Sequence, residues 1–113
     1  MLNMKIIDFI NEGGKNVIKE YLSSLPKKEC TEGYKIRHRI WNDGLLALEA
    51  LDTRQLRGKL WEIKFSDNRI MYVLKDKDSI YFLHACKKQK NKAEKFELDT
   101  ALKRARKYGL EVD

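Results

Sequence analysis

The sequence has few of the residues that stabilise small secreted domains, disordered segments or membrane proteins. It contains two cysteines, one proline and six glycines in 113 residues. Two cysteines exclude a disulfide-rich scaffold, and so few prolines and glycines argue against disorder. No apolar run approaches the roughly 20 residues of a membrane-spanning helix, and the N-terminus shows no signal-peptide pattern. We therefore expect one cytoplasmic globular domain over residues 1–113.

The sequence also has no recognisable metal-binding spacing. His38 and His84 do not combine with Cys30 and Cys86 into the ligand spacing of a zinc site. His84 and Cys86 are two residues apart, so they lie on one side of a predicted strand, but two ligands are too few for a structural zinc ion. We expect neither a metal ion nor a cofactor.

Positive charge is what the chain has in excess. Its 24 Lys and Arg residues face 17 Asp and Glu residues, which gives a net charge of +7 and a pI near 9.4. Residues 84–108 alone carry nine basic and three acidic residues. This balance indicates a polyanionic partner, either nucleic acid or an acidic protein.

Hydrophobic periodicity predicts an α+β domain with the element order β-α-α-β-β-β-α. Strands are expected at 5–10, 60–65, 69–74 and 80–86, and helices at 16–25, 27–42 and 91–108. Residues 45–56 fit either a short helix or a turn. The last three strands follow one another through short polar turns, which predicts an antiparallel meander.

The meander brings basic residues from different strands together. Alternation places Glu62 and Lys64 on the face opposite the apolar residues of their strand. Arg69 opens the next strand, and His84 lies near the end of the third. Because these strand ends meet at one end of the sheet, we expect Lys64, Arg69 and the basic loop 87–92 to converge.

A positive pocket of this kind suits cleavage of an RNA backbone. The reaction removes a proton from a 2′-hydroxyl, adds negative charge at phosphorus and protonates the 5′-oxygen. Arginine binds two phosphate oxygens at once, histidine exchanges protons near neutral pH, and a lysine crowded by cations can act as a base. The simpler alternative is a solvated basic surface. Phe96 points away from the apolar stripe of its helix and could either stack on a base or pack on another segment.

Four stretches of the sequence carry a family resemblance: Leu56–Lys64, Asn68–Leu74, Phe82–Lys90 and Ala101–Ala105. Together they resemble the RelE/ParE superfamily, and most of all its HigB-like branch of phage-derived host-inhibition toxins. The resemblance implies a small twisted, mainly antiparallel sheet with an N-terminal helical hairpin and a C-terminal helix. It also implies cleavage of mRNA, usually on the ribosome, without a metal ion. The implied partner is a HigA-like helix-turn-helix antitoxin, which forms a complex with the toxin and binds operator DNA.

Residue by residue, the resemblance places the basic position of the first meander strand at Lys64 and the phosphate-contacting arginine at Arg69. The basic position after the last strand falls on Lys88, or on Lys87. The sequence departs from RelE at Glu62, where RelE has a second lysine. It also lacks a matching catalytic tyrosine in the C-terminal segment, where Phe96 and Tyr108 are the nearest aromatic residues.

The leading hypothesis is a toxin of a type II toxin–antitoxin system that cleaves mRNA on the ribosome. Arg69 would stabilise the phosphate, Lys64 or His84 would act as base, and Lys88 would act as acid or electrostatic clamp. The residues expected to hold RNA are Arg57, Lys59, Lys87, Lys90, Lys92 and Phe96. Two alternatives remain open: a ParE-like inhibitor of DNA gyrase without nuclease activity, and a nucleic-acid-binding module without catalysis.

Overall fold

The computed structural model describes residues 3–88 and 90–113, apart from the side chains of residues 91 and 93. Helices and strands occur in separate runs along the chain, as is typical of an α+β fold. In chain order the elements are β1 (Lys5–Asp8), α1 (Val17–Ser23), α2 (Lys27–Asp43), α3 (Leu45–Ala50), β2 (Thr53–Arg57), β3 (Leu60–Phe65), β4 (Asn68–Asp76), β5 (Ser79–Lys87) and α4 (Asn91–Lys107).

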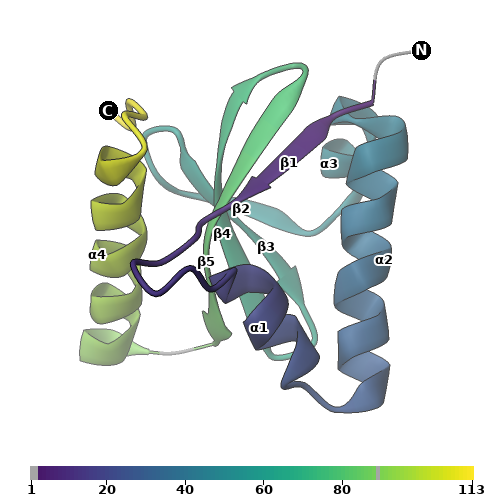
Figure 1. The fold of residues 1–113 in the computed structure, drawn as a ribbon, viewed down its shortest axis with the longest axis horizontal. Helices are drawn as coiled ribbons and strands as arrows, with labels where there is room; N and C mark the ends of the chain where they lie inside the picture. Colours follow the sequence, from purple (N-terminus) through teal and green to yellow (C-terminus); the bar gives the residue numbers. More distant parts are fainter. Residues whose placement is uncertain (1–2, 89) are drawn as a thin grey trace.

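The strands form one sheet in the order β1-β5-β4-β3-β2. Strands β2 to β5 make an antiparallel meander, and β1 lies parallel to the first half of β5. Helices α1, α2 and α3 lie on one side of the sheet, and α4 stands on the other side (Figure 1). The fold class predicted from the sequence is confirmed, and so is the meander.

The face under α1, α2 and α3 carries the larger apolar core. Ile18, Leu22, Ile40 and Phe82 are fully buried there. Gly33 lies inside α2, where glycine weakens a helix. A Cβ atom at this position would lie 2.6 Å from Cδ2 of Leu22, so the glycine allows α2 to pack closely on α1.

The face under α4 carries a smaller core. Leu60, Met71 and Leu83 on the strands pack against Ala101 and Ala105 on α4. This is the stripe predicted from the helical spacing of the C-terminal segment. Within the described residues, no helix combines the length and the apolar character that crossing a membrane would require.

Two features differ from the sequence prediction. Residues 45–50 form the short helix α3, which is one of the two predicted alternatives, but an additional strand, β2, follows at Thr53–Arg57. Strand β2 lies at the edge of the sheet, and most of its residues are exposed. Its sequence therefore does not alternate between apolar and polar residues, and the strand could not be predicted from it. The first strand ends at Asp8, because Ile10 forms only an isolated bridge with Asn16 before the chain turns.

Candidate functional site

The candidate site lies on the sheet face under α4, close to the turn between β3 and β4. In the strand register Lys64 stands opposite Arg69, and Arg69 stands opposite Cys86. One step further along the strands, Met71 stands between Glu62 and His84. Successive side chains alternate between faces, so these residues share the α4 face. The structure thus brings Lys64 and Arg69 together.

Arg69 is enclosed in a chain of ion pairs. Its Nε lies 3.2 Å from Oε1 of Glu62, and its Nη1 lies 3.3 Å from Oε1 of Glu94 on α4. Arg54 on β2 joins both carboxylates, at 2.9 Å from Glu62 and 3.2 Å from Glu94. The side chains of Glu62 and Arg69 are 0% and 3% exposed, so their charges require this mutual compensation.

The ion pair between Arg69 and Glu62 is not an ideal hydrogen bond. Both carboxylate oxygens of Glu62 and the Nε of Arg69 are buried and lack a partner in hydrogen-bond geometry among the described residues. Buried polar atoms of this kind are rare in folded proteins. They leave Arg69 electrostatically balanced but incompletely bonded, which is favourable for a group that binds a ligand.

A cavity opens beside Arg69, between β2 and the start of α4. We call it the Arg69 pocket. It has a volume of 350 Å³ and is lined by Arg54, Gln55, Leu56, Arg69, Met71, Glu94, Lys95 and Leu98. The hydrogen bond from Arg69 holds the pKa of Glu94 below its ordinary value, so this carboxylate is ionised at neutral pH. Three cations and one anion therefore face the cavity.

A second polar group lies further along α4, and we call it the His84 cluster. It consists of His84, Cys86, Glu97 and Arg104. The Nε2 of His84 lies 3.0 Å from Oε2 of Glu97, and its Nδ1 lies 3.0 Å from Nη1 of Arg104. Burial lowers the pKa of His84, although the hydrogen bond with Glu97 opposes this, so the imidazole is neutral at pH 7. Both ring nitrogens are already engaged.

Comparison with known proteins defines the family. The family model described as "Phage derived protein Gp49-like" matches residues 20–106. The chain belongs to this family. The Gp49-like family is of the RelE/HigB type, so the resemblance noted in the sequence is confirmed.

The fold of this Gp49-like chain is that of RelE. A crystal structure of the archaeal RelE–RelB complex from Pyrococcus horikoshii OT3 contains a chain that matches with a TM-score of 0.60 and 21% sequence identity. The match covers 80% of the Gp49-like chain and 100% of the archaeal chain. None of the curated proteins searched matches it.

The basic residues between the end of β5 and the start of α4 do not line the Arg69 pocket of the Gp49-like chain. The backbone N–H of Lys88 donates to the carbonyl of Asp67 at 2.7 Å, which holds the loop against the β3–β4 turn. Lys87 points to the other face of the sheet, where its Nζ lies 3.6 Å from Glu29. Lys90 and Lys92 are exposed at the start of α4.

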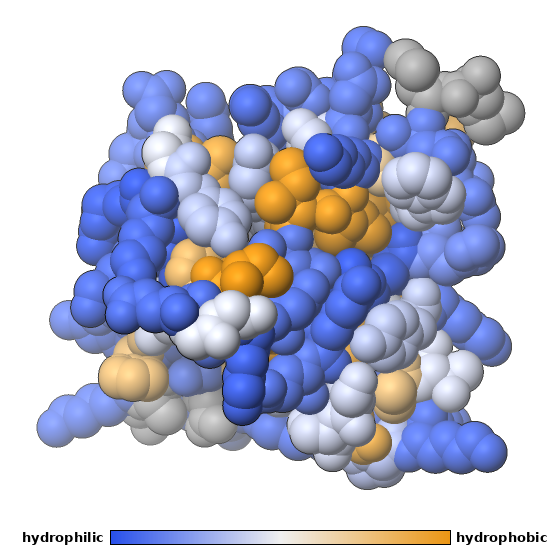
Figure 2. Space-filling view, in the orientation of Figure 1, coloured by the Kyte–Doolittle hydropathy of each residue, from blue (hydrophilic) through white to orange (hydrophobic). Residues whose placement is uncertain are grey.

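Phe96 is 68% exposed on α4, so it makes no extensive contact with another segment. This exposure leaves its ring accessible to a base. Hydrophilic side chains dominate the outer edge of the α4 side in the surface view (Figure 2).

Arg57 and Lys59 do not line the Arg69 pocket, although Leu56, next to Arg57, does. They flank the β2–β3 turn, five residues of strand away from Lys64, or about 17 Å. Arg57 pairs with Asp113 at 3.2 Å. Tyr108 follows the C-terminal end of α4, roughly 20 Å along the helix from Glu94. Its hydroxyl accepts a hydrogen bond from the Ile10 N–H at 2.9 Å. It therefore does not take the place of a catalytic tyrosine in the Arg69 pocket.

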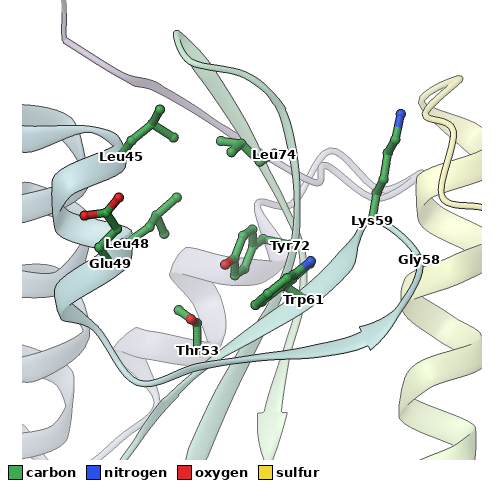
Figure 3. Close-up of a pocket in the computed structure, with 9 residues that line it drawn as sticks. All are labelled: Leu45, Leu48, Glu49, Thr53, Gly58, Lys59, Trp61, Tyr72 and Leu74. Carbon is green, nitrogen blue, oxygen red and sulfur yellow. The ribbon is translucent and has the colours of Figure 1, made fainter.

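A larger apolar groove lies on the opposite face of the sheet. It has a volume of 430 Å³ and runs between α3 and strands β3 and β4 (Figure 3). Leu48 on α3 points toward Tyr72 on β4, and Trp61 closes one side, whereas the Lys59 side chain points away from these apolar residues. The groove brings together none of the residues predicted to be catalytic.

Sequence reasoning missed Arg54, Glu94 and Lys95 as residues of the site. Arg54 lies on the unrecognised strand β2, and the residues of α4 reach the pocket only through tertiary packing. One feature of the sequence pointed to these contacts: Glu62 is acidic where RelE has a lysine. In the structure the negative charge of Glu62 compensates the positive charges of Arg54 and Arg69.

Proposed function

We propose that this protein is the toxin of a type II toxin–antitoxin pair and that it cleaves mRNA without a metal ion. The observation that carries the proposal is the Arg69 pocket: in a chain with a RelE fold, Arg69, Arg54 and Lys95 line a cavity of 350 Å³. Lys64 stands opposite Arg69 in the strand register, outside the lining of the cavity. Translating ribosomes would supply the substrate, and translation would stop as messages are cut.

The phosphate of the scissile bond would enter the Arg69 pocket and compete with Glu94. Arg54 and Arg69 each contact Oε1 of Glu94 through one guanidinium nitrogen. A phosphodiester carries the same single negative charge as Glu94, but its two free oxygens could bind one arginine each, and its charge grows in the transition state. Glu94 is 41% exposed, so it can turn into solvent at small energetic expense. Glu62 would stay in place and keep both arginines oriented.

The chemistry requires one base and one acid. Lys64 would take the proton from the 2′-hydroxyl, whose oxygen attacks phosphorus and forms a 2′,3′-cyclic phosphate. Lys88 would protonate the departing 5′-oxygen, and Arg69 would stabilise the charge that develops on the phosphoryl oxygens. His84 is the alternative base, although both of its nitrogens are engaged within the His84 cluster.

Further cations would hold the rest of the RNA. Lys90 and Lys92 are exposed at the start of α4, and the exposed ring of Phe96 would stack on a base. Lys87 points to the other face of the sheet, where it would leave Glu29 to contact RNA. Arg57 and Lys59, at the far turn, would contact RNA beyond the cut site. The proposed partner is a HigA-like helix-turn-helix antitoxin that forms a complex with the toxin and binds operator DNA.

The test is induced expression followed by primer-extension mapping of messenger RNA. The variants are Lys64→Ala, the paired substitution Glu62→Met with Arg69→Met, and Lys19→Ala as a control, since Lys19 is an exposed lysine of α1. We expect growth arrest and discrete cuts inside translated messages for the wild type and for Lys19→Ala, and loss of both for the other variants.

Growth arrest with intact messages would contradict the nuclease proposal. A simultaneous DNA-damage response would then indicate a gyrase inhibitor of the ParE kind. Circular dichroism of each purified variant separates loss of chemistry from loss of folding.

A further inference from the structure

The His84 cluster contains three potential metal ligands from two elements. His84 and Cys86 are two residues apart on β5, so both side chains lie on the face that α4 covers. Glu97 on α4 faces them. One ligand atom from each residue lies within 4.8 Å of the other two. We propose that His84, Cys86 and Glu97 bind a divalent transition-metal ion of the zinc class.

The donor set suits such an ion. Zinc binds thiolate sulfur, imidazole nitrogen and carboxylate oxygen, and three protein ligands with one open position are a common arrangement. Hard ions such as magnesium prefer oxygen ligands throughout. A site with one sulfur, one nitrogen and one oxygen therefore suits zinc, and cobalt(II) as its spectroscopic substitute, better than magnesium or calcium.

The surroundings also fit a metal site. The side chains of His84 and Glu97 are 13% and 16% exposed, and Cys86 is buried, so the ligands are held by packing. A cavity of 320 Å³ lies beside His84, lined in part by Arg104 and Tyr21. An ion could approach the imidazole from this side.

Metal binding would rearrange the protons of the cluster. Cys86 would lose its thiol proton to solvent, and the ion would replace the proton that His84 shares with Glu97 at Nε2. The imidazole proton would then move to Nδ1, so Arg104 must leave that nitrogen. Arg104 can do so because it also donates to the carbonyl of Leu83 at 3.0 Å.

The ion would connect α4 to β5 directly. Three bonds would span the interface between the helix and the sheet, one helical turn away from Glu94 in the Arg69 pocket. In that state His84 could not act as a base, which leaves Lys64 in that role. The metal site does not depend on the proposed nuclease activity and can be tested without it.

The experiment is a titration of the purified, reduced protein with cobalt(II), followed by displacement with zinc(II). Cobalt reports a thiolate ligand through a charge-transfer band in the near ultraviolet. We expect one cobalt ion per chain and this band in the wild type. Cys30→Ser is the matched control, because it removes the other cysteine, which lies on α2 and outside the cluster.

Cys86→Ser should abolish the band, and Glu97→Gln should weaken cobalt binding by at least about tenfold, whereas Cys30→Ser should behave as the wild type. A band that disappears in Cys30→Ser, an absent band in the wild type, or an unchanged affinity in Glu97→Gln would overturn the proposal. Thermal unfolding gives a second readout: zinc should raise the Tm of the wild type and of Cys30→Ser, and not that of Cys86→Ser.

Discussion

The two faces of the sheet differ in how much charge they bury relative to their apolar core, although the same strands build both. The face under α1, α2 and α3 holds the larger apolar core, with residues such as Ile70 and Phe82, and a buried ion pair between Asp8 and Arg37. The face under α4 buries Glu62, Arg69 and much of His84 next to a smaller apolar core. Buried charge adds little net stability compared with apolar packing. The comparison suggests that the first face stabilises the fold and the second serves binding and chemistry.

The largest effect is expected from a cavity in the apolar face. Phe82 is fully buried, so Phe82→Ala should lower the free energy of unfolding by about 3–5 kcal/mol. Phe96→Ala removes the same side chain from an exposed site on α4 and should change stability by less than about 0.5 kcal/mol. Urea denaturation measures both. Equal losses in the two variants would contradict the assignment of the main core to the first face.

The second largest effect is expected from the Glu62–Arg69 ion pair on the α4 face, where two variants distinguish stability from function. Arg69→Met leaves Glu62 buried with only one arginine, and we expect a loss of about 3 kcal/mol. Adding Glu62→Met removes the uncompensated charge and replaces the pair with apolar side chains. The double variant should regain most of the stability, measured by urea denaturation, but should not regain cleavage of mRNA.

Regained stability without regained cleavage would indicate that the Glu62–Arg69 ion pair serves function and not stability. If the double variant stays as unstable as Arg69→Met, the ion pair is itself a main source of stability and the contrast between the faces fails. If it cleaves mRNA, Arg69 does not contact the phosphate.

Periodicity was sufficient to predict much of this architecture. Alternation along 60–65 placed Lys64 on the face away from the apolar core, and the short turns predicted an antiparallel meander. Because the partners in an antiparallel hairpin follow from the position of its turn, the approach of Lys64 and Arg69 could be derived from sequence. The helical spacing of the last segment likewise predicted the buried stripe of α4.

The rest depended on contacts between elements that are distant in sequence. Arg54 and Glu94 are 40 residues apart, and no local pattern predicts that they meet. The strand that carries Arg54 is exposed at the sheet edge, so burial left no periodic signal in it. Glu97 completes the His84 cluster in the same way, from a helix whose register against the sheet is fixed only by packing.

A smaller effect concerns a polar group within the apolar face. Burial raises the pKa of Tyr72 to about 12, although a hydrogen bond with Thr53 acts in the opposite direction. The folded state therefore keeps its proton where the unfolded chain, with a pKa near 10, loses it. The free energy of unfolding should therefore be constant below pH 10 as far as Tyr72 is concerned, and should fall by roughly 2 kcal/mol as the pH rises to 12.

Urea denaturation across this range measures the loss. Tyr72→Phe should reduce it, whereas Tyr34→Phe, at an exposed site on α2, should not. The same alkaline loss in Tyr72→Phe would show that other groups cause it.

The smallest effect on stability should accompany a clear effect on binding. Glu94 is 41% exposed, so Glu94→Gln should change the free energy of unfolding by less than about 1 kcal/mol. If Glu94 occupies the place of a phosphate, its neutralisation frees Arg54 and Arg69 for RNA. The affinity for an uncleavable 2′-O-methyl RNA should then rise by up to about tenfold, equal to about 1.4 kcal/mol.

Asp99→Asn is the matched control for Glu94→Gln, because it makes the same change of charge on the same helix, outside the Arg69 pocket. A general increase in positive charge would strengthen RNA binding equally in both variants, and that result would remove the role proposed for Glu94. A gain restricted to Glu94→Gln would show that the α4 face keeps its arginines balanced by a carboxylate that the substrate displaces. Glu62, which is fully buried, pairs with the same arginines, so in that case one carboxylate would orient them and the other would compete with RNA.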